Sequence, residues 1–506
     1  MTFVRGREVP TPAEYSVDVV IVGSGAGGSM AARELARHGK SVLVLEEGAD
    51  HLPTDFDQRE EHMIPQLFAE LGGRRTDDLS TMILSGRGVG GSTIHNTNLI
   101  KRTDPEILDL WREDHGITSL DDRSMALYFD EVEALLGVAP IPEERISEHN
   151  RLFRRGVNAL GYRGGVLSHN RDSRCVGSGF CELGCAYDGK MNARRVVLPE
   201  AVELGATVVS DARVTRIAHD GSRCIGVTGM FTDERGRDRG SFAVSADVVV
   251  LAGSAIGSPG LALASAIPDP HGQIGAHLHL HPGAAIAGVF DEAVEAWRGI
   301  PQSYECTEFL ELSPGARNHV WIVPSFAHPA GTAALTPGFG PDLMRSMRSY
   351  PNLAVLAAMV HDETEGNVYL SGERARIAYR PARPDREQLA LGTREAARIL
   401  FAAGATEVRV PAMPPIVLRS VDDIESITSE RFLPHDAALT AVHPMGSMRM
   451  GADPSTSVCD GLGKVHSIDG LYVMDGSIFP TSIGVPPQLS IYAFALRNAR
   501  ALAAIL

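Results

Sequence analysis

The sequence has little of what marks a secreted, disulfide-rich or nucleic-acid-binding protein. Only 6 cysteines occur in 506 residues, and the first residues are not followed by the apolar stretch of a signal peptide. We therefore expect a cytoplasmic chain whose cysteines are thiols or metal ligands rather than disulfides. Basic residues are outnumbered, 47 Lys and Arg against 63 Asp and Glu, which gives a net charge of −16. Such a chain repels phosphate backbones, so nucleic acid is excluded as an expected partner.

Long apolar runs are missing as well. The longest stretch without a charged residue, 248–268, is long enough to suggest a membrane span. However, Gly253, Gly257, Pro259 and Gly260 interrupt it, and we interpret it as a buried strand followed by a turn and a helix. We therefore expect no membrane span. Hydrophobic residues still make up 44% of the chain, which is enough for a sizeable globular core.

Glycine, in contrast, is abundant, and its 52 residues fall in clusters. One cluster, GSGAGG at 23–28, follows a β-branched run at 17–22 and opens a helical pattern at 30–36. A second strand at 41–45 completes a βαβ unit of about thirty residues. This arrangement is typical of a dinucleotide-binding domain built on a parallel sheet.

Each residue type in that unit has a physical role. Gly23 permits the tight turn, Gly25 lets the backbone approach a pyrophosphate, and Gly28 permits close packing of the helix on the strand. The N–H groups at the start of the helix face the phosphate charge. Glu46, at the end of the second strand, would accept hydrogen bonds from the adenosine ribose. This acid favours FAD or NAD over NADP.

A second domain is indicated by a change in composition and in secondary-structure pattern along the chain. Further strands at 207–209, 247–251 and 471–475 are expected to join the first sheet. Between roughly 106 and 170, and between 290 and 434, the chain is more charged and mixes helix and strand patterns. All three tryptophans lie in those stretches, and we expect them to share the aromatic core of the second domain.

Four motifs resemble those of the glucose–methanol–choline (GMC) flavin oxidoreductases, and they occur in the family's order. They are GRGVGGSTIHN at 86–96, the strand and turn at 247–259, HPMGSMRMG at 443–451 and LYVMDGSIFP at 471–480. The resemblance implies an FAD-dependent enzyme that oxidises alcohols, and it is nearer to the long-chain-alcohol and sterol-type members.

The predicted fold class is therefore α/β, a Rossmann-like FAD-binding domain with a parallel sheet, interrupted by a second α+β substrate (cap) domain. We assign 14–105, 190–289 and 436–506 to the FAD-binding domain, and 106–189 and 290–435 to the cap. Beyond the first glycine turn and Glu46, the resemblance places further residues at the diphosphate, the ribityl chain, the adenine and the flavin ring. These implied FAD-binding residues are Gly88, Gly91, Ser92, Asn96, Val214, Asp475 and Gly476.

The resemblance also implies a catalytic residue and reveals a gap. His443 occupies the position of the family's catalytic histidine, and an imidazole suits the removal of a hydroxyl proton near neutral pH. The family places a second His or Asn a short distance downstream, where this chain has Pro486, which has no side-chain donor. We expect Gln488 or Asn96 to take over that contact, or His443 to act alone.

Two clusters of metal-binding residue types leave alternatives open. Cys175, Cys181 and Cys185 resemble a structural loop beside the flavin in long-chain-alcohol and sterol-type members, and also the three-cysteine site of an iron–sulfur cluster in some sugar dehydrogenases of the family. A disulfide is a third alternative. His277, His279 and His281 would point to one face of a strand. A zinc site is conceivable there, but we interpret the segment as structural.

The sequence thus predicts FAD-dependent oxidation of a primary or secondary alcohol, by hydride transfer to flavin N5, with His443 as general base. The expected partners are a small-molecule alcohol and either oxygen or another electron acceptor. One alternative is a dehydrogenase that passes electrons through an iron–sulfur cluster at the three cysteines. Another, prompted by Pro486, is a flavin-binding protein without alcohol chemistry.

Overall fold

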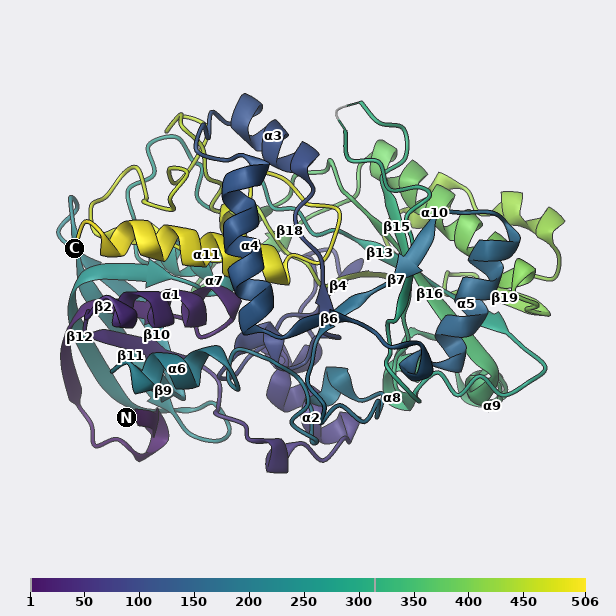
Figure 1. The fold of residues 1–506 in the computed structure, drawn as a ribbon, viewed down its shortest axis with the longest axis horizontal. Coiled ribbons are helices and arrows are strands. Elements are labelled where there is room, and N and C mark those ends of the chain that lie inside the picture. The colour runs from purple at the N-terminus through teal and green to yellow at the C-terminus, as the bar shows by residue number, and fades with distance from the viewer. Residues whose placement is uncertain (1, 314) are drawn as a thin grey trace.

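The computed structural model describes residues 2–313 and 315–506, which form two lobes side by side (Figure 1). Each lobe is built on its own large sheet, and both ends of the chain lie in the same lobe. Among the described residues, no helix combines the length and the apolar character needed to cross a membrane.

The first sheet is mostly parallel, as predicted. β2 and β3 lie at its centre, because their apolar runs are buried on both faces. The long β12 runs parallel to β2, with β22 beside its end and the antiparallel pair β11 and β10 beside its start. All the predicted strands belong to this sheet. In spatial order its strands are β1 (Thr2–Arg5), β9 (Thr207–Ser210), β3 (Val42–Leu45), β2 (Ala13–Val22), β12 (Asp238–Leu251), β11 (Cys224–Thr232) and β10 (Ala212–His219), with β22 (Leu471–Val473) on β12.

Helices cover this sheet and close its core. α1 follows β2 and packs between α6 and α11, with Met30 and Leu35 fully buried. It ends at Arg37, and Gly39 just beyond it has a φ of +77°, which is the left-handed conformation of a helix C-terminus. The helices of this lobe are α1 (Ala26–Arg37), α3 (Pro105–Asp114), α4 (Asp122–Leu135), α6 (Val197–Glu203), α7 (Ser254–Ala264) and α11 (Gln488–Ala503).

The second sheet is antiparallel along its main path, and two helices, α5 and α10, pack against it (Figure 1). β13 lies at its centre, between β19 and β16, and β21 also pairs with the start of β13 and with β4. The elements are β20 (Ile416–Leu418), β19 (Glu407–Val410), β13 (Gly283–Val289), β16 (Leu353–Val360), β15 (Val320–Pro324), β14 (Tyr304–Cys306), β7 (Gly164–Val166), β21 (Leu439–Ala441), β4 (Thr81–Ile83), α5 (Glu148–Ala159) and α10 (Arg383–Ala402).

Smaller elements fill the junction and the edges of the two lobes. They are the hairpin β17 (Asn367–Ser371) and β18 (Arg374–Ala378), the small sheet of β5 (Leu99–Ile100), β8 (Ser168–Asn170) and β6 (Val138–Pro140), and the helices α2 (Glu60–Leu67), α8 (Pro329–Leu335) and α9 (Gly340–Arg348).

The expectation that the three tryptophans share the core of the second domain is wrong. Trp111, on α3, lies in the core of the first lobe, where its ring stacks on Phe479 with centroids 5.3 Å apart and meets Phe494 edge-on. Only Trp297 and Trp321 lie in the second lobe. The charge pattern of 105–135 misled the prediction, because α3 and α4 are amphipathic helices that bury one face against the first lobe.

Candidate functional site

The two glycine-rich segments predicted to bind a dinucleotide meet at the start of α1. Gly25 is the N-cap of this helix, and the Cα of Gly91 lies 3.9 Å from where a Cβ on Gly25 would be. No other heavy atom of the described residues comes that close to this position. The first N–H groups of α1 lie at the open end of the helix, where they attract a negatively charged group. The space between Gly25 and Gly91 therefore suits a phosphate.

Gly23 and Gly28 are required by packing. Gly23 has a φ of +104°, and a Cβ there would lie 2.3 Å from the carbonyl oxygen of Ala252. A Cβ on Gly28 would lie 2.0 Å from the carbonyl oxygen of Gly23. These distances are shorter than any real contact. A side chain at Gly23 would push the end of β2 away from the segment after β12, and a side chain at Gly28 would push α1 away from the turn after β2.

Glu46 joins the two glycine segments. Its Oε2 accepts hydrogen bonds from the backbone N–H of Ser24 (3.1 Å) and from Ser24 Oγ (2.7 Å). Its Oε1 accepts from the N–H groups of Gly48 (3.0 Å) and Gly88 (3.1 Å). Burial raises the pKa of this carboxyl. Because a carboxylate accepts about four hydrogen bonds, the predicted ribose contact would have to displace one of these donors.

The other predicted loop residues are held by hydrogen bonds within the protein. Ser92 Oγ accepts from the N–H of Gly86 (2.8 Å), and the N–H of Gly91 donates to the carbonyl of Gly88 (2.8 Å). Val214 lies on β10, opposite Gly229 of β11. Its predicted backbone contact with adenine stays a prediction.

Asp475 is an N-cap in the structure. Its carboxylate accepts from Ser258 Oγ (2.5 Å), the N–H of Ser254 (2.9 Å), and the N–H and Oγ of Ser477 (2.8 and 2.5 Å). Burial raises its pKa. The side chain thus fixes Gly476 and the start of α7 beside α1, where a Cβ on Gly27 would overlap the carbonyl oxygen of Met474. Any contribution of Asp475 to FAD binding therefore comes through the backbone that it holds.

The side chains of Asn96 and Gln488, which are far apart in the sequence, contact each other in the first lobe. Asn96 Nδ2 donates to Gln488 Oε1, and Asn96 Oδ1 accepts from the N–H of Asn98 at 3.2 Å. Gln488 is the first residue of α11 and is buried, and its Nε2 has no partner among the described residues. Gln488 therefore has a donor to spare for a ligand, and Pro486 precedes it by two residues.

His443 lies beyond the end of β21, at the junction of the two lobes. The residue is half-buried, and its Nδ1 lies 2.9 Å from Nδ1 of His281. Burial lowers the pKa of His443 to about 3, so its imidazole is neutral near pH 7. The described residues place no hydrogen-bonding group on its Nε2, and no direct hydrogen bond joins it to Asn96 or Gln488.

The prediction that His277, His279 and His281 point to one face of a strand is wrong. The segment is not a strand, because His277 and His281 have φ values of +60° and +52°. His277 contacts Glu365, 2.7 Å from its Nδ1, whereas His281 contacts His443. The left-handed residues turn the backbone and separate the three rings.

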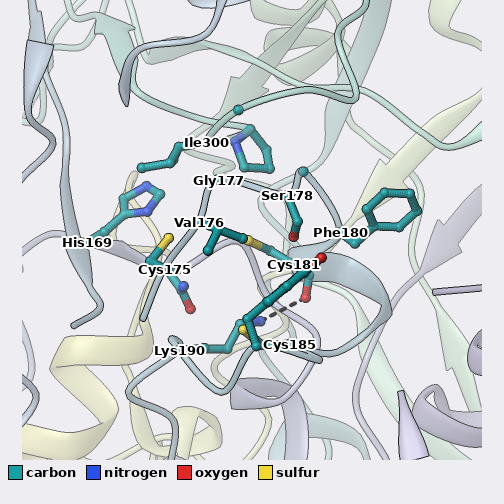
Figure 2. Close-up of a pocket in the computed structure, with 15 residues that line it drawn as sticks. His169, Cys175, Val176, Gly177, Ser178, Phe180, Cys181, Cys185, Lys190 and Ile300 are labelled. Carbon is teal, nitrogen blue, oxygen red and sulfur yellow. Dashed lines mark hydrogen bonds between the residues drawn. The ribbon is translucent and has the colours of Figure 1, made fainter. Parts of the chain in front are cut away.

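The three clustered cysteines line one pocket (Figure 2). Cys175, Cys181 and Cys185 are unpaired, and burial raises the pKa of the Cys181 thiol to about 12. The cavity has a volume of about 20 Å³, which is room for about one water molecule. No three His, Cys, Asp or Glu side chains of the described residues are placed to hold a metal ion. These residues therefore do not fit an iron–sulfur cluster in this arrangement, and the structural-loop alternative agrees with their placement.

Lys190, beside this pocket, is a residue that the sequence reasoning missed. It is 1% exposed, and its Nζ donates to the carbonyl oxygens of Asn96 (2.5 Å), Cys181 (2.8 Å) and Ile94 (2.9 Å). Figure 2 shows its ammonium group among the thiols. No carboxylate of the described chain lies within 4 Å of it, and burial lowers its pKa. Lys190 therefore ties the cysteine loop to the backbone of Asn96.

Replacing Lys190 by Met should lower the free energy of unfolding by about 3 kcal/mol, because three carbonyl groups lose a charged donor that is itself buried. Urea unfolding of the flavin-loaded protein measures this change. Cys181→Ser is the matched control, since Lys190 bonds only the backbone of Cys181, and it should leave stability and the flavin spectrum unchanged. A Lys190→Met protein as stable as the wild type would show that the hydrogen bonds of Lys190 do not stabilise the fold.

A parallel sheet whose two glycine segments meet at a helix N-terminus is the architecture of a dinucleotide-binding domain, and here a second lobe is joined to it. The chain belongs to the GMC oxidoreductase family: its N-terminal family model matches residues 17–283 and its C-terminal model matches residues 362–495. It is accordingly an oxidoreductase enzyme whose cofactor is FAD.

Individual relatives agree with this assignment. An uncharacterized GMC-type oxidoreductase of Mycobacterium tuberculosis is 34% identical, over 96% of this chain and 76% of that protein. A long-chain-alcohol oxidase of Arabidopsis thaliana is 31% identical, over 94% of this chain and 66% of that protein. Among solved structures, the pyridoxine 4-oxidase from Mesorbium loti has the same fold, with a TM-score of 0.71 and 20% identity, covering 96% of this chain and 98% of that chain.

Proposed function

We propose that this enzyme oxidises a primary or secondary alcohol to the carbonyl compound, with His443 as the base that takes the hydroxyl proton. The observation that carries the proposal is the state of His443. Its imidazole is neutral, its Nδ1 is held by His281, and its Nε2 has no hydrogen-bond partner among the described residues. An unprotonated ring nitrogen at the junction of the two lobes can accept a hydroxyl proton.

The chain has the features needed to hold FAD. The space beside Gly25 and Gly91 accepts a phosphate, and the open N-terminus of α1 attracts its charge. Gln488 Nε2 is a buried donor without a partner among the described residues. Bound FAD supplies the acceptor for the hydride that leaves the alcohol carbon. The residues of the chain orient the alcohol and manage its proton.

Gln488 is the best candidate for the contact that Pro486 cannot make. Its Oε1 is already bonded to Asn96, which fixes the orientation of the amide and leaves Nε2 free to donate. A donor at this place would hold the substrate oxygen while His443 takes the proton. Asn96 then acts as the residue that orients Gln488.

We propose a moderately apolar organic alcohol as the substrate. The supporting observation is the similarity of 31% and 29% to proteins named long-chain-alcohol oxidases, over 94% and 97% of this chain. Oxygen or another acceptor then reoxidises the cofactor.

Anaerobic mixing of the FAD-loaded protein with a panel of primary and secondary alcohols of increasing chain length tests this function. We expect the flavin absorbance band to bleach with at least one alcohol, and faster with apolar alcohols than with small polar ones. Dithionite serves as the control that the flavin can be reduced. A flavin that dithionite bleaches and that no alcohol bleaches would indicate a flavin-binding protein without alcohol chemistry.

A further inference from the structure

His281 touches the proposed base and is fully buried. Its Nδ1 lies 2.9 Å from Nδ1 of His443, and the two rings meet edge to edge, with centroids 5.0 Å apart and planes 28° apart. The Nε2 of His281 is buried and has no partner in the described part of the chain. Among the described residues, His443 is therefore the only polar side chain that the His281 ring bonds.

The backbone of His281 is held in an unusual conformation. Its φ of +52° lies in the left-handed region, which non-glycine residues seldom adopt. Asp362 holds this turn, because its carboxylate accepts from the N–H groups of His281 (3.1 Å) and Leu280 (2.9 Å). Tyr379 donates to the same carboxylate at 2.7 Å. The backbone that carries the His281 ring is thus held in place by Asp362 and Tyr379.

We propose that His281 is a positioning residue of the reaction, whose Nδ1 accepts the Nδ1–H of His443 and so leaves Nε2 of His443 unprotonated and facing the substrate. This inference rests on the proposed function of His443. Two neutral imidazoles that meet through Nδ1 atoms share one proton between them. With that proton on His443, its Nε2 is a base, whereas with the proton on His281, the Nε2 of His443 carries hydrogen and cannot accept another.

The same contact accounts for the proton during turnover. The O–H bond of the alcohol breaks and its proton binds Nε2 of His443, while the hydride leaves the carbon for FAD. The ring then carries a positive charge, and it shares its Nδ1 proton with His281. The titratable groups that face the His281 ring are His443 and His361, and the Asp362 carboxylate accepts from its backbone N–H. His281 thereby helps the single base to work without a partner at Pro486.

Three substitutions of His281 test the proposal. Asn and Asp both tolerate left-handed backbone, and each places an oxygen close to the position of the histidine Nδ1. We expect His281→Asn to stay within about fivefold of the wild-type rate of anaerobic flavin reduction. His281→Leu removes the acceptor and should be about 10–100-fold slower at equal FAD content. His319→Leu, which lies just before β15 and has no hydrogen bond to His443, is the matched control and should keep the wild-type rate.

The pH profile separates positioning from a merely structural role. In His281→Asp, the carboxylate beside Nδ1 stabilises the protonated form of His443 and raises its pKa, so the acid limb of the rate profile should move to higher pH. His281→Leu combined with His443→Ala should be no slower than His443→Ala alone. Three results would each overturn the inference. They are a wild-type rate in His281→Leu, an unchanged pH profile in His281→Asp, and a double variant whose loss of rate is the product of the two single losses.

The design also separates this inference from the proposed function. If His443→Ala itself reduces at the wild-type rate, the assignment of the base fails. If His443→Ala is slow while the Leu and Asp variants behave as the wild type, only the role of His281 fails. Should the Leu variant not fold, Asn and Asp differ by one charge in the same shape, and identical pH profiles for these two would still overturn the proposal.

Discussion

His443→Ala is expected to keep the fold and the FAD content but to slow anaerobic flavin reduction by about 10²–10⁴-fold. This factor corresponds to roughly 3–5 kcal/mol of activation free energy. We expect the full loss of rate that removal of a general base causes, because Pro486 supplies no second base and Gln488 can only donate or accept a hydrogen bond. Stopped-flow mixing with the best alcohol of the panel, at matched flavin occupancy, measures the effect.

Two pH measurements belong to this prediction. Burial lowers the pKa of His443 to about 3, so the wild-type imidazole stays neutral between pH 5 and 8, and its reduction rate should be flat there rather than fall near the ordinary histidine pKa of about 6.5. In His443→Ala, raising the pH should restore part of the rate, since an ionised alcohol needs no base. An unchanged rate in the variant would remove His443 from the mechanism.

Gly25→Val should give a folded but colourless protein. The backbone at Gly25 has a φ of −67°, which any residue adopts, and a Cβ there lies 3.9 Å from the nearest atom of the protein. The branched side chain therefore fits the protein but fills the space proposed for the pyrophosphate. We expect FAD affinity to fall by at least about 100-fold, or roughly 3 kcal/mol.

The ratio of flavin to protein absorbance and a titration of the apoprotein with FAD measure this loss, while circular dichroism reports the fold. Gly257→Ala, where no atom lies within 4 Å of the new Cβ, is the control and should stay yellow. Gly28→Ala provides the contrast, because its Cβ would overlap the Gly23 carbonyl oxygen and should destabilise the fold itself. A stoichiometric yellow Gly25→Val protein would show that the phosphate does not lie beside Gly25.

The first lobe was predictable from the sequence because its signals are local. The residues at 19–21 and 248–251 are apolar and buried, and Gly23 and Gly28 have contacts that only glycine allows. The second sheet was not predictable in detail, because the register that brings β13 between β16 and β19 depends on contacts between distant segments. Its strands could be expected only as mixed helix and strand patterns.

The parts of the site that sequence reasoning missed depend on single backbone angles and on burial. His281 was interpreted as structural, since nothing in HLHLHP shows that two of its histidines adopt left-handed conformations. Lys190 gave no warning either, because a lysine is ordinarily exposed and only the fold shows it bonded to three carbonyl groups. The motifs identified His443, but only the structure shows what holds it.

The place of β22 in the first sheet has a consequence for synthesis in the cell. β2 and β22 are separated by most of the sequence, yet β12 pairs with both, and α11 packs on α1. At about 5–20 residues per second, a ribosome needs tens of seconds to make the intervening chain. During that time the apolar face of α1 that α11 later covers is open to water, which makes the nascent chain a natural client of chaperones. The cofactor loop can therefore become rigid only as a late event in the production of the enzyme.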